Sequence, residues 1–251
     1  MSLITQRIQP EIVSRLTDAE IETCADKLRS TYQSTIGIAK PCIDAQDVIW
    51  SLLQKRDGLV LDDPRYLGLD QDGNRVLGYT VGDYEGGVIC IDETLNGTPR
   101  YVFTLAHELG HWTLHRALLA DAFARTKECG ANGMPTLECN LGLGAQTKIP
   151  SAGVPRQEWQ ANRFAVHLLM PGALIRESFR KRISQEPINY CQKCQRVNRF
   201  QDAHPTMRSF TLWLAGRDRP FHLAWEFGVS KEALAIRIEE LGLVINAPPT
   251  H

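Results

Sequence analysis

The feature that most constrains the fold of this chain is the pentad His107-Glu108-Leu109-Gly110-His111, which lies inside a mainly apolar run from residue 101 to 115. An α-helix turns about 100° per residue, so two histidines four residues apart project from one face with their Cβ atoms about 5–6 Å apart. Two imidazoles at this spacing can bind one metal ion, and Glu108 points to one side of them, where it can take a proton from water. The pentad therefore predicts a helix that carries half of a zinc site.

The same pentad can also arise by chance on an amphipathic helix, with the histidines in a core and the glutamate in water. The residues around it argue for a buried helix, because they supply six apolar side chains: Phe103, Leu105, Ala106, Leu109, Trp112 and Leu114. A buried helix must satisfy the polar side chains that it carries. A bound metal ion explains the two histidines and the glutamate together.

The third ligand must come from elsewhere in the chain, because a catalytic zinc site usually has three protein ligands and one open position. Two histidines and one glutamate form an established set, and Glu158 is our candidate for the third ligand. It lies in the first turn of a predicted helix that begins at Pro155, and Asn162, four residues further on, is expected to hydrogen-bond it. By spacing alone, three other residues compete for this role: Asp121, Glu128 and His115.

Length and composition indicate a globular protein without a disulfide framework. The chain has 251 residues, of which 43% are hydrophobic and 23% charged, and its seven cysteines are scattered, which fits reduced thiols. The formal net charge of -1 gives no general attraction to nucleic acids, so we expect nucleic-acid binding only at a local patch, if at all. Neither a signal peptide nor an apolar run long enough to span a membrane is present, so we expect no membrane association and a cytoplasmic location.

Capping signals and apolar periodicity predict both helices and strands. Before the pentad we expect helices at 17–34 and 44–57, a strand at 59–61, and a hairpin of strands at 76–81 and 87–91. After it we expect a loop at 120–154, helices at 155–171, 173–182 and 206–215, and a helix-turn-helix-like pair at 221–241. If a hairpin strand formed the edge of the sheet, it could bind an extended peptide by strand addition; an internal strand is the alternative.

Three motifs follow one another along the chain. The first is Phe103 to His111 with His115, the second is Glu158 to Ala165 leading to Met170-Pro171, and the third is Leu223 to Ser230 leading to Leu241-Gly242-Leu243. Together they resemble the ImmA/IrrE family of metallopeptidases, over about residues 17–244. The resemblance implies an α+β fold, mostly helical and zincin-like, with a small antiparallel sheet. It also implies a metallopeptidase domain at 1–172 and a C-terminal helical, helix-turn-helix-like subdomain at 173–251 packed on it.

The resemblance further implies a zinc endopeptidase in which His107, His111 and Glu158 bind Zn²⁺ and Glu108 is the catalytic base. Its expected partner is a protein substrate, a helix-turn-helix repressor or an antitoxin. The alternative function is a non-catalytic zinc-containing regulator that binds DNA or a protein. The two functions differ in the fourth coordination position, which a structural site would close with a side chain.

Weaker signals leave several roles open. The residue that stabilises the oxyanion could be one of four: His115, Tyr84, Tyr101 or His167. Cys191 and Cys194 have zinc-knuckle spacing and could form a second, structural zinc site with Cys129 and Cys139. Residues 176–199 contain seven basic and two acidic side chains, which predict either a patch for DNA or an acidic partner, or a solvated helix face.

Overall fold

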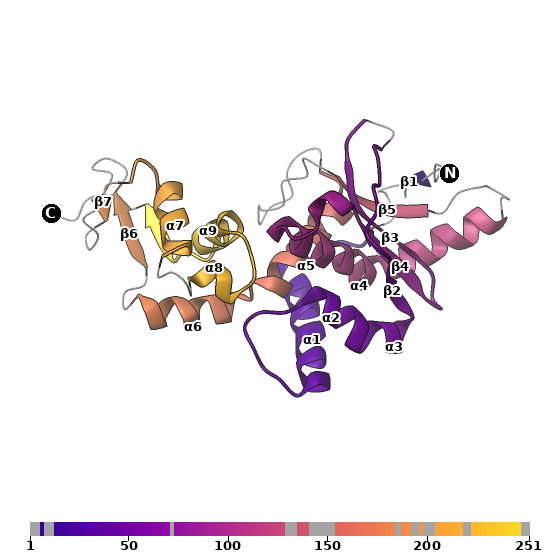
Figure 1. Cartoon of the computed structure of the whole chain (residues 1–251), viewed down its shortest axis with the longest axis horizontal. Helices are drawn as coiled ribbons and strands as arrows, with labels where there is room; N and C mark the ends of the chain where they lie inside the picture. Colours follow the sequence, from indigo (N-terminus) through magenta and orange to yellow (C-terminus); the bar gives the residue numbers. More distant parts are fainter. Residues whose placement is uncertain are drawn as a thin grey trace. The chain divides into compact units, whose positions relative to one another are not determined.

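The computed structural model describes residues 6–7, 13–70, 73–128, 135–140, 154–183, 187–191, 196–197, 204–217 and 222–246, and for 6–7, 126–128, 135–140 and 196–197 it describes the backbone alone. The chain divides into two compact units, Met1–Leu168 and Leu169–His251, whereas the sequence suggested a boundary after residue 172. Both units combine helices with a sheet (Figure 1). The predicted α+β, mostly helical fold class is confirmed.

The first helices of unit 1 form where the capping signals predict them. Helix α1 (Asp18–Ile36) begins with a capping box in which the Thr17 hydroxyl accepts from the Glu20 N–H, and it ends at Gly37, whose φ of 69° places it in the left-handed region. The predicted helix at 44–57 consists of α2 (Ala45–Val48), a π-helical turn (Ile49–Leu53) and α3 (Gln54–Asp57). In the sequence these helices follow one short strand of the sheet, Gln6–Arg7, and precede its other strands.

The sheet of unit 1 has the strand order β1-β5-β3-β4-β2. Its strands are β1 (Gln6–Arg7), β2 (Leu59–Leu61), β3 (Val76–Gly82), β4 (Gly87–Ile91) and β5 (Pro135–Asn140). The β3–β4 hairpin is antiparallel as predicted, but β2 runs parallel to β4 and β1 parallel to β5. The sheet is therefore mixed rather than antiparallel. Both hairpin strands are internal, so neither presents the free edge that strand addition requires.

Helix α4 (Pro99–Glu128) carries the pentad and follows a short 3-10 helix, Glu93–Leu95. The loop predicted at 120–154 is wrong in two places, because α4 continues to residue 128 and β5 occupies Pro135–Asn140. The helix continues because the chain contains neither glycine nor proline between Gly110 and Gly130.

Helix α4 packs against the hairpin through Trp112. A Cβ atom at Gly82 or Gly87 would overlap the Trp112 ring, so only glycine allows the indole to lie against both strands. The guanidinium of Arg116 lies 4.4 Å from the centre of the same ring and donates to the carbonyl oxygens of Asp83 and Tyr84 in the hairpin turn. These contacts fix the helix relative to β3 and β4.

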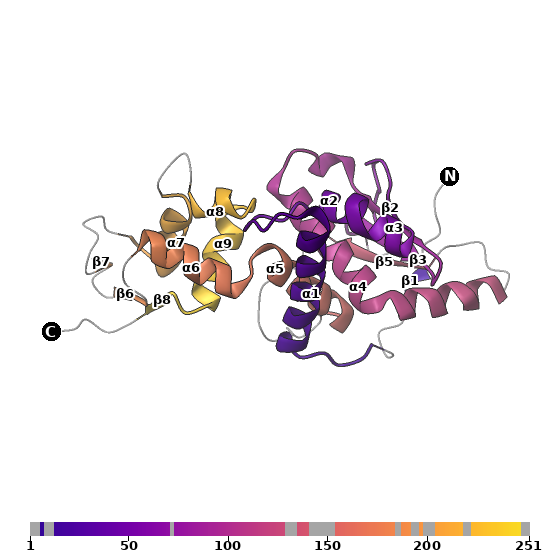
Figure 2. The same ribbon diagram turned by 90° about the horizontal axis from the view of Figure 1, so that it is seen from below.

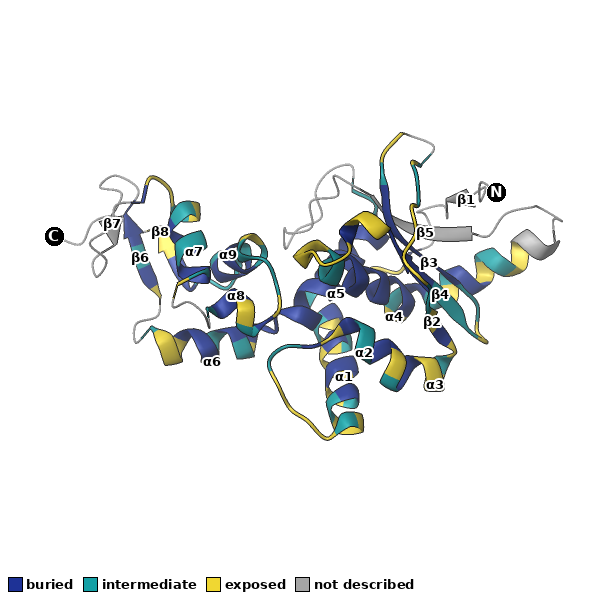
Figure 3. Cartoon of the chain, viewed as in Figure 1, coloured by how far each residue is buried: buried dark blue, intermediate teal, exposed yellow. Residues whose placement is uncertain are grey.

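Helix α5 (Arg156–Leu169) lies beside α4 in both views of the ribbon (Figure 1 and Figure 2). The two helices approach most closely at Gly110, where an added Cβ would lie 3.0 Å from the Cα of Ala161. From Gln157 to its end α5 is buried (Figure 3), which fits a helix at the centre of the unit. The close approach at Gly110 allows side chains of α5 to reach the pentad.

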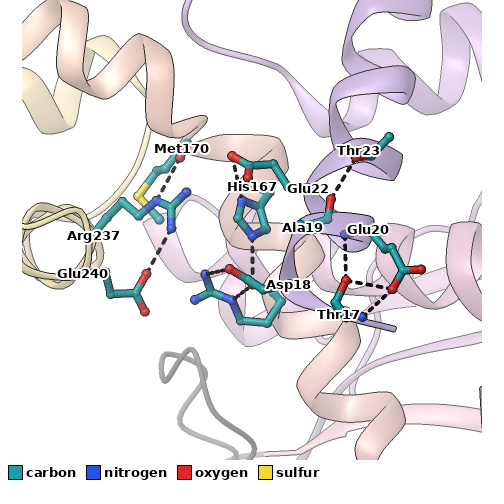
Figure 4. A network of polar contacts seen from close by, with 11 residues as sticks. Thr17, Asp18, Ala19, Glu20, Glu22, Thr23, His167, Met170, Arg237 and Glu240 are labelled. Carbon is teal, nitrogen blue, oxygen red and sulfur yellow. Dashed lines mark hydrogen bonds and ion pairs between the residues drawn. The ribbon is translucent and has the colours of Figure 1, made fainter. Parts of the chain in front are cut away.

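A polar network joins α1 to α5 (Figure 4). The carboxylate of Asp18 accepts a hydrogen bond from Arg163 Nε at 2.7 Å, and its Oδ1 lies 3.0 Å from His167 Nε2. The other ring nitrogen of His167 lies 3.5 Å from Glu22 Oε1. Burial alone would raise the pKa of Asp18, but the hydrogen bonds from His167 and Arg163 hold it well below its usual range. The network therefore pairs opposite charges between the two helices.

Unit 2 contains four helices among its described residues: α6 (Gly172–Arg182), α7 (Met207–Ala215), α8 (Leu223–Glu226) and α9 (Lys231–Glu240). Helices α8 and α9 form the predicted helix-turn-helix-like pair, and the Ser230 hydroxyl caps α9. Arg237 of α9 is buried, donates to the carbonyl of Met170 at 3.1 Å and pairs with Glu240 (Figure 4).

A three-stranded sheet in unit 2 was missed by the prediction of a purely helical subdomain. Its order is β7-β6-β8, with strands β6 (Ile188–Cys191), β7 (Arg196–Val197) and β8 (Val244–Asn246). Strand β8 lies beyond the helix-turn-helix-like pair and pairs in parallel with β6. These strands are too short to show a periodicity of their own, and the pairing of β6 with β8 joins segments that are distant in sequence.

The basic stretch is partly used for packing within unit 2. Arg182 lies 2.6 Å from Glu226, and Arg176 donates to the carbonyl of Leu241. Lys181 pairs with Glu177 on the exposed side of α6. These contacts favour the helix-face interpretation of the described part of the stretch.

Two other predictions concern residues that the structure describes only in part. Cys129 and Cys194 lie outside the described residues, and for Cys139 only the backbone is described, so the four-cysteine zinc site stays a prediction. Within the described residues, no helix combines the length and the apolar character needed to cross a bilayer.

Candidate metal centre

Three predicted ligands meet where α4 passes the first turn of α5. His107 Nε2 lies 2.9 Å from His111 Nε2, and the Glu158 carboxylate oxygens lie 3.2 Å and 3.3 Å from these two nitrogens. One ligand atom from each residue lies within 4.8 Å of the others, and all three residues are buried. Glu158 thus takes the place that spacing left open for the third ligand.

The chemistry of these atoms fits a metal ion. Glu158 Oε2 is buried and makes no hydrogen bond in the described part of the chain, although it lies close to His107 Nε2. When both rings are neutral and unprotonated at Nε2, two ring nitrogens and a carboxylate converging on one point present lone pairs to one another, which is costly in a buried site unless a proton or a cation lies between them. A cation bound between them would satisfy all three groups at once, and His₂Glu is an established metal-ligand set.

The charges of the site are coupled. Burial alone would raise the pKa of Glu158, but His111 and His107 hold it well below its usual range. Burial lowers the pKa of His111, whereas contact with Glu158 outweighs burial and raises the pKa of His107. An ionised Glu158 and a neutral His111 are in the protonation states that metal ligation requires.

Asn162 orients His107. Its Oδ1 accepts a hydrogen bond from His107 Nδ1 at 2.7 Å, which leaves the lone pair of Nε2 directed toward His111 and Glu158. The prediction that Asn162 would hydrogen-bond Glu158 is therefore wrong. Asn162 lies one turn further along α5, and from there it reaches the outer nitrogen of His107.

The competing candidates for the third ligand lie elsewhere. His115 is buried, and its two ring nitrogens contact His111 Nδ1 at 3.1 Å and Gln160 Oε1 at 2.8 Å. Burial and the neighbouring His111 lower the pKa of His115 to about 3, so it is a neutral imidazole near pH 7. Asp121 is exposed on α4, and the side chain of Glu128 lies outside the described residues.

Glu108 is buried beside the ligand cluster and is held by strand β3. The Thr80 hydroxyl donates to Glu108 Oε2 at 2.6 Å. Gly78, two residues earlier on the same strand, makes room for the carboxylate, because an added Cβ would lie 2.9 Å from Glu108 Oε1. Local sequence patterns predicted a role for neither Thr80 nor Gly78, although a glycine inside a strand is a signal of close approach.

The four candidates for oxyanion stabilisation have other surroundings. His167 lies between Asp18 and Glu22, and His115 between His111 and Gln160. The Tyr101 hydroxyl accepts a hydrogen bond from Gln46 Nε2 at 2.9 Å, and Tyr84 is 66% exposed. The structure brings none of these side chains into the described contacts of Glu158.

Comparison with known protein families decides the classification of the chain. A model of the M78 peptidases, described as the IrrE N-terminal-like domain, matches residues 65–239. The chain belongs to this family. The match includes the hairpin, α4 with the pentad, α5 with Glu158, and the helix-turn-helix-like pair as far as residue 239. It therefore contains the first two motifs of the resemblance and the third without its ending, Leu241-Gly242-Leu243. M78 is a family of metallopeptidases, which agrees with a metal-binding centre at His107, His111 and Glu158. A search of curated proteins found no match.

Proposed function

We propose that this M78 peptidase is a zinc-dependent endopeptidase that cleaves a regulatory protein, a helix-turn-helix repressor or an antitoxin. The observation that carries the proposal is the convergence of three buried ligand atoms within 4.8 Å, with Glu108 next to one of them on the same helix. His107, His111 and Glu158 would hold the ion. A zinc ion in such a site supplies Lewis acidity, which polarises a carbonyl group and makes water more acidic.

Glu108 is the base in this proposal. Its carboxylate takes one proton from the attacking water while the water oxygen bonds to the carbonyl carbon of the scissile peptide. When the carbon–nitrogen bond breaks, Glu108 returns this proton to the leaving amine, so the carboxylate is regenerated. The Thr80 hydroxyl holds one oxygen of Glu108 by a hydrogen bond of 2.6 Å, and Gly78 leaves space for the carboxylate above β3.

The substrate class rests on the resemblance to the ImmA/IrrE metallopeptidases, whose members typically act on transcriptional repressors or antitoxins. The test is to incubate the full chain with zinc and repressor-like proteins encoded beside it, and to look for a discrete cut by mass spectrometry. We expect cleavage by the wild type and a rate about 10²–10⁴-fold lower for Glu108→Gln, because a positioned general base contributes about that factor.

Two controls make this test specific. Glu93→Gln removes an exposed carboxylate upstream of α4 and should leave cleavage unchanged. Removal of zinc by a chelator should stop cleavage, and added zinc should restore it. Full cleavage by Glu108→Gln with bound zinc would refute the role of Glu108. A zinc ion closed by a fourth side chain would instead favour the non-catalytic regulator.

A further inference from the structure

A chain of hydrogen bonds runs from the backbone before α1 to the ligand His111. It starts at the carbonyl oxygen of Ser14, which accepts from Gln160 Nε2 at 2.8 Å. Gln160 Oε1 lies 2.8 Å from His115 Nε2, and His115 Nδ1 lies 3.1 Å from His111 Nδ1. Gln160 and His115 are buried, so the two contacts of the His115 ring form away from solvent, whereas the bond to Ser14 is partly buried.

The direction of each bond follows from its first member. A backbone carbonyl can only accept, so the amide nitrogen of Gln160 faces Ser14 and its oxygen faces His115. His115 Nε2 must then donate to that oxygen. The hydrogen-bond partners of the His115 ring are the neutral Gln160 amide and the His111 ring, and burial disfavours an imidazolium there, so His115 carries one proton and its Nδ1 accepts.

The last bond defines the state of the ligand. Because His115 Nδ1 accepts, His111 Nδ1 donates, and the lone pair of His111 lies on Nε2, which faces His107 and Glu158. Metal-ligating histidines commonly donate their outer N–H to an acceptor, which fixes the tautomer and the ring orientation. Here the acceptor is a second histidine, which is itself oriented by a buried amide.

We propose that His115 and Gln160 are positioning residues that hold His111 in the tautomer whose Nε2 binds the metal, and that the Ser14 carbonyl sets the direction of this chain. The inference rests on the metal-binding part of the proposed function. Two helices carry the ligands of the metal centre. In this proposal the backbone segment before α1 also contributes to the centre, by orienting one of these ligands.

The same segment also contacts the first turn of α5 at a second point. Arg156 donates to the carbonyl oxygen of Val13 at 3.2 Å, so the segment holds α5 at Arg156 and at Gln160, on either side of Glu158 in sequence. Displacement of Val13 and Ser14 would therefore disturb both the orientation of His111 and the turn that carries Glu158. Metal affinity is the property that should report such a change.

The test measures zinc affinity in the full chain by competition with a chromophoric chelator. His115→Phe and Gln160→Met each break the chain, and we expect each to weaken zinc binding about 10–100-fold, as is usual for groups that orient metal ligands. Gln157→Met is the matched control, because Gln157 is a buried amide in the same helix turn whose Oε1 makes no hydrogen bond in the described part of the chain. Its zinc affinity should stay within about threefold of the wild type, because it leaves the ligand-orienting chain intact.

A tautomer measurement on the zinc-loaded wild type keeps the proposal testable if a variant does not fold. Long-range ¹⁵N–¹H correlation spectra should show His115 with its proton on Nε2 and His111 with its proton on Nδ1. A His115 proton on Nδ1, or unchanged zinc affinity in both folded variants, would overturn the proposal. Absence of zinc binding by the wild type would overturn it together with the proposed function, whereas zinc binding without cleavage would refute the peptidase activity alone.

Discussion

Helix α5 carries two buried polar clusters that differ in how their atoms are paired. In its second half, Arg163 and His167 face the carboxylate of Asp18, so a guanidinium and a ring nitrogen meet one acceptor. In its first half, Glu158 faces two imidazole nitrogens that lie 2.9 Å from each other, and one of its oxygens makes no hydrogen bond in the described part of the chain. The Asp18 cluster satisfies its own polar groups as a contact between helices, whereas the Glu158 cluster has the geometry of a group that could hold a metal ion.

This difference separates a structural network from a binding site on one helix. In a folded protein most buried polar atoms have hydrogen-bond partners. A buried polar atom without one often marks a position that binds a ligand or serves a function. Variants in the Glu158 cluster should therefore change metal affinity, and variants in the Asp18 cluster should change stability.

Glu158→Ala should produce the largest effect. Loss of one of three ligands should weaken zinc binding by more than about 100-fold, which exceeds the usual effect of removing an orienting residue. Competitive titration of the full chain measures the affinity. Glu22→Ala is the matched control, because it removes a carboxylate that contacts His167 in the other cluster. Equal zinc affinities for the two variants would erase the distinction between the clusters.

Asp18→Asn should affect stability and leave the metal centre intact. Arg163 is fully buried, and Asp18→Asn removes the charge of a carboxylate that accepts from its guanidinium, so we expect the free energy of unfolding to fall by about 2–3 kcal/mol. Urea unfolding of the full chain measures this change, with Asp26→Asn as a control for an exposed aspartate on the same helix. A loss of zinc affinity without a loss of stability would contradict the division.

The pH dependence of stability in the metal-free protein should also distinguish the clusters. An unfolded histidine has a pKa of about 6.5, whereas His115 in the fold has a pKa of about 3. Below pH 6.5 the unfolded chain therefore binds a proton that the folded chain does not, and stability falls as the pH falls. The loss attributable to His115 between pH 7 and pH 5 should reach about 2 kcal/mol at most.

Two variants separate this contribution from that of Asp18. His115→Phe should reduce the loss of stability between pH 7 and pH 5. Asp18→Asn should change the loss only at lower pH, because the pKa of Asp18 lies below that of an unfolded aspartate, which is about 3.9. Unfolding measured at pH 7, 5 and 3.5 tests this order. An unchanged slope in His115→Phe would show that His115 is already protonated in the fold.

Thr80→Val should have the smallest effect of the four. The variant removes the donor to Glu108 Oε2 and keeps the shape of the side chain, so we expect a rate about tenfold lower at unchanged zinc affinity, the size of one lost hydrogen bond to a buried acceptor. Thr80→Ser keeps the hydroxyl and should retain most of the rate. The assay uses the substrate that the cleavage test identifies. Equal rates for the two variants would mean that Thr80 does not position Glu108.

Local signals predicted much of the fold. Thr17, Asp44 and Ser230 cap helices where the sequence indicated, and the hairpin strands lie where alternation and glycine placed them. The end of α4 was predicted too early. The predicted loop at 120–154 was based on a stretch rich in glycine and proline, but these residues begin only at Gly130, after the end of the helix. The parallel pairings of β1, β2 and β8 depend on contacts between distant segments, which local patterns do not specify.

The candidate site divides in the same way. His107, Glu108 and His111 lie within five residues of one another, so the geometry of a single helix predicted that they lie close together. Glu158 lies on a distant helix; its place in the first turn of that helix made it the candidate, and the three-motif resemblance supported it over the other ligands that spacing left open. Thr80 and Gln160 come from other elements and act through the ligands and the base, and only their contacts in the fold identify them.

Anomalous diffraction at the zinc edge, from crystals of the full chain grown with zinc, tests the metal centre most directly. We expect a peak bonded to the Nε2 atoms of His107 and His111 and to the Glu158 carboxylate at about 2.0–2.2 Å, with the remaining position open to solvent. A peak confined to the cysteines, or a site at the histidines that excludes Glu158, would contradict the proposed centre.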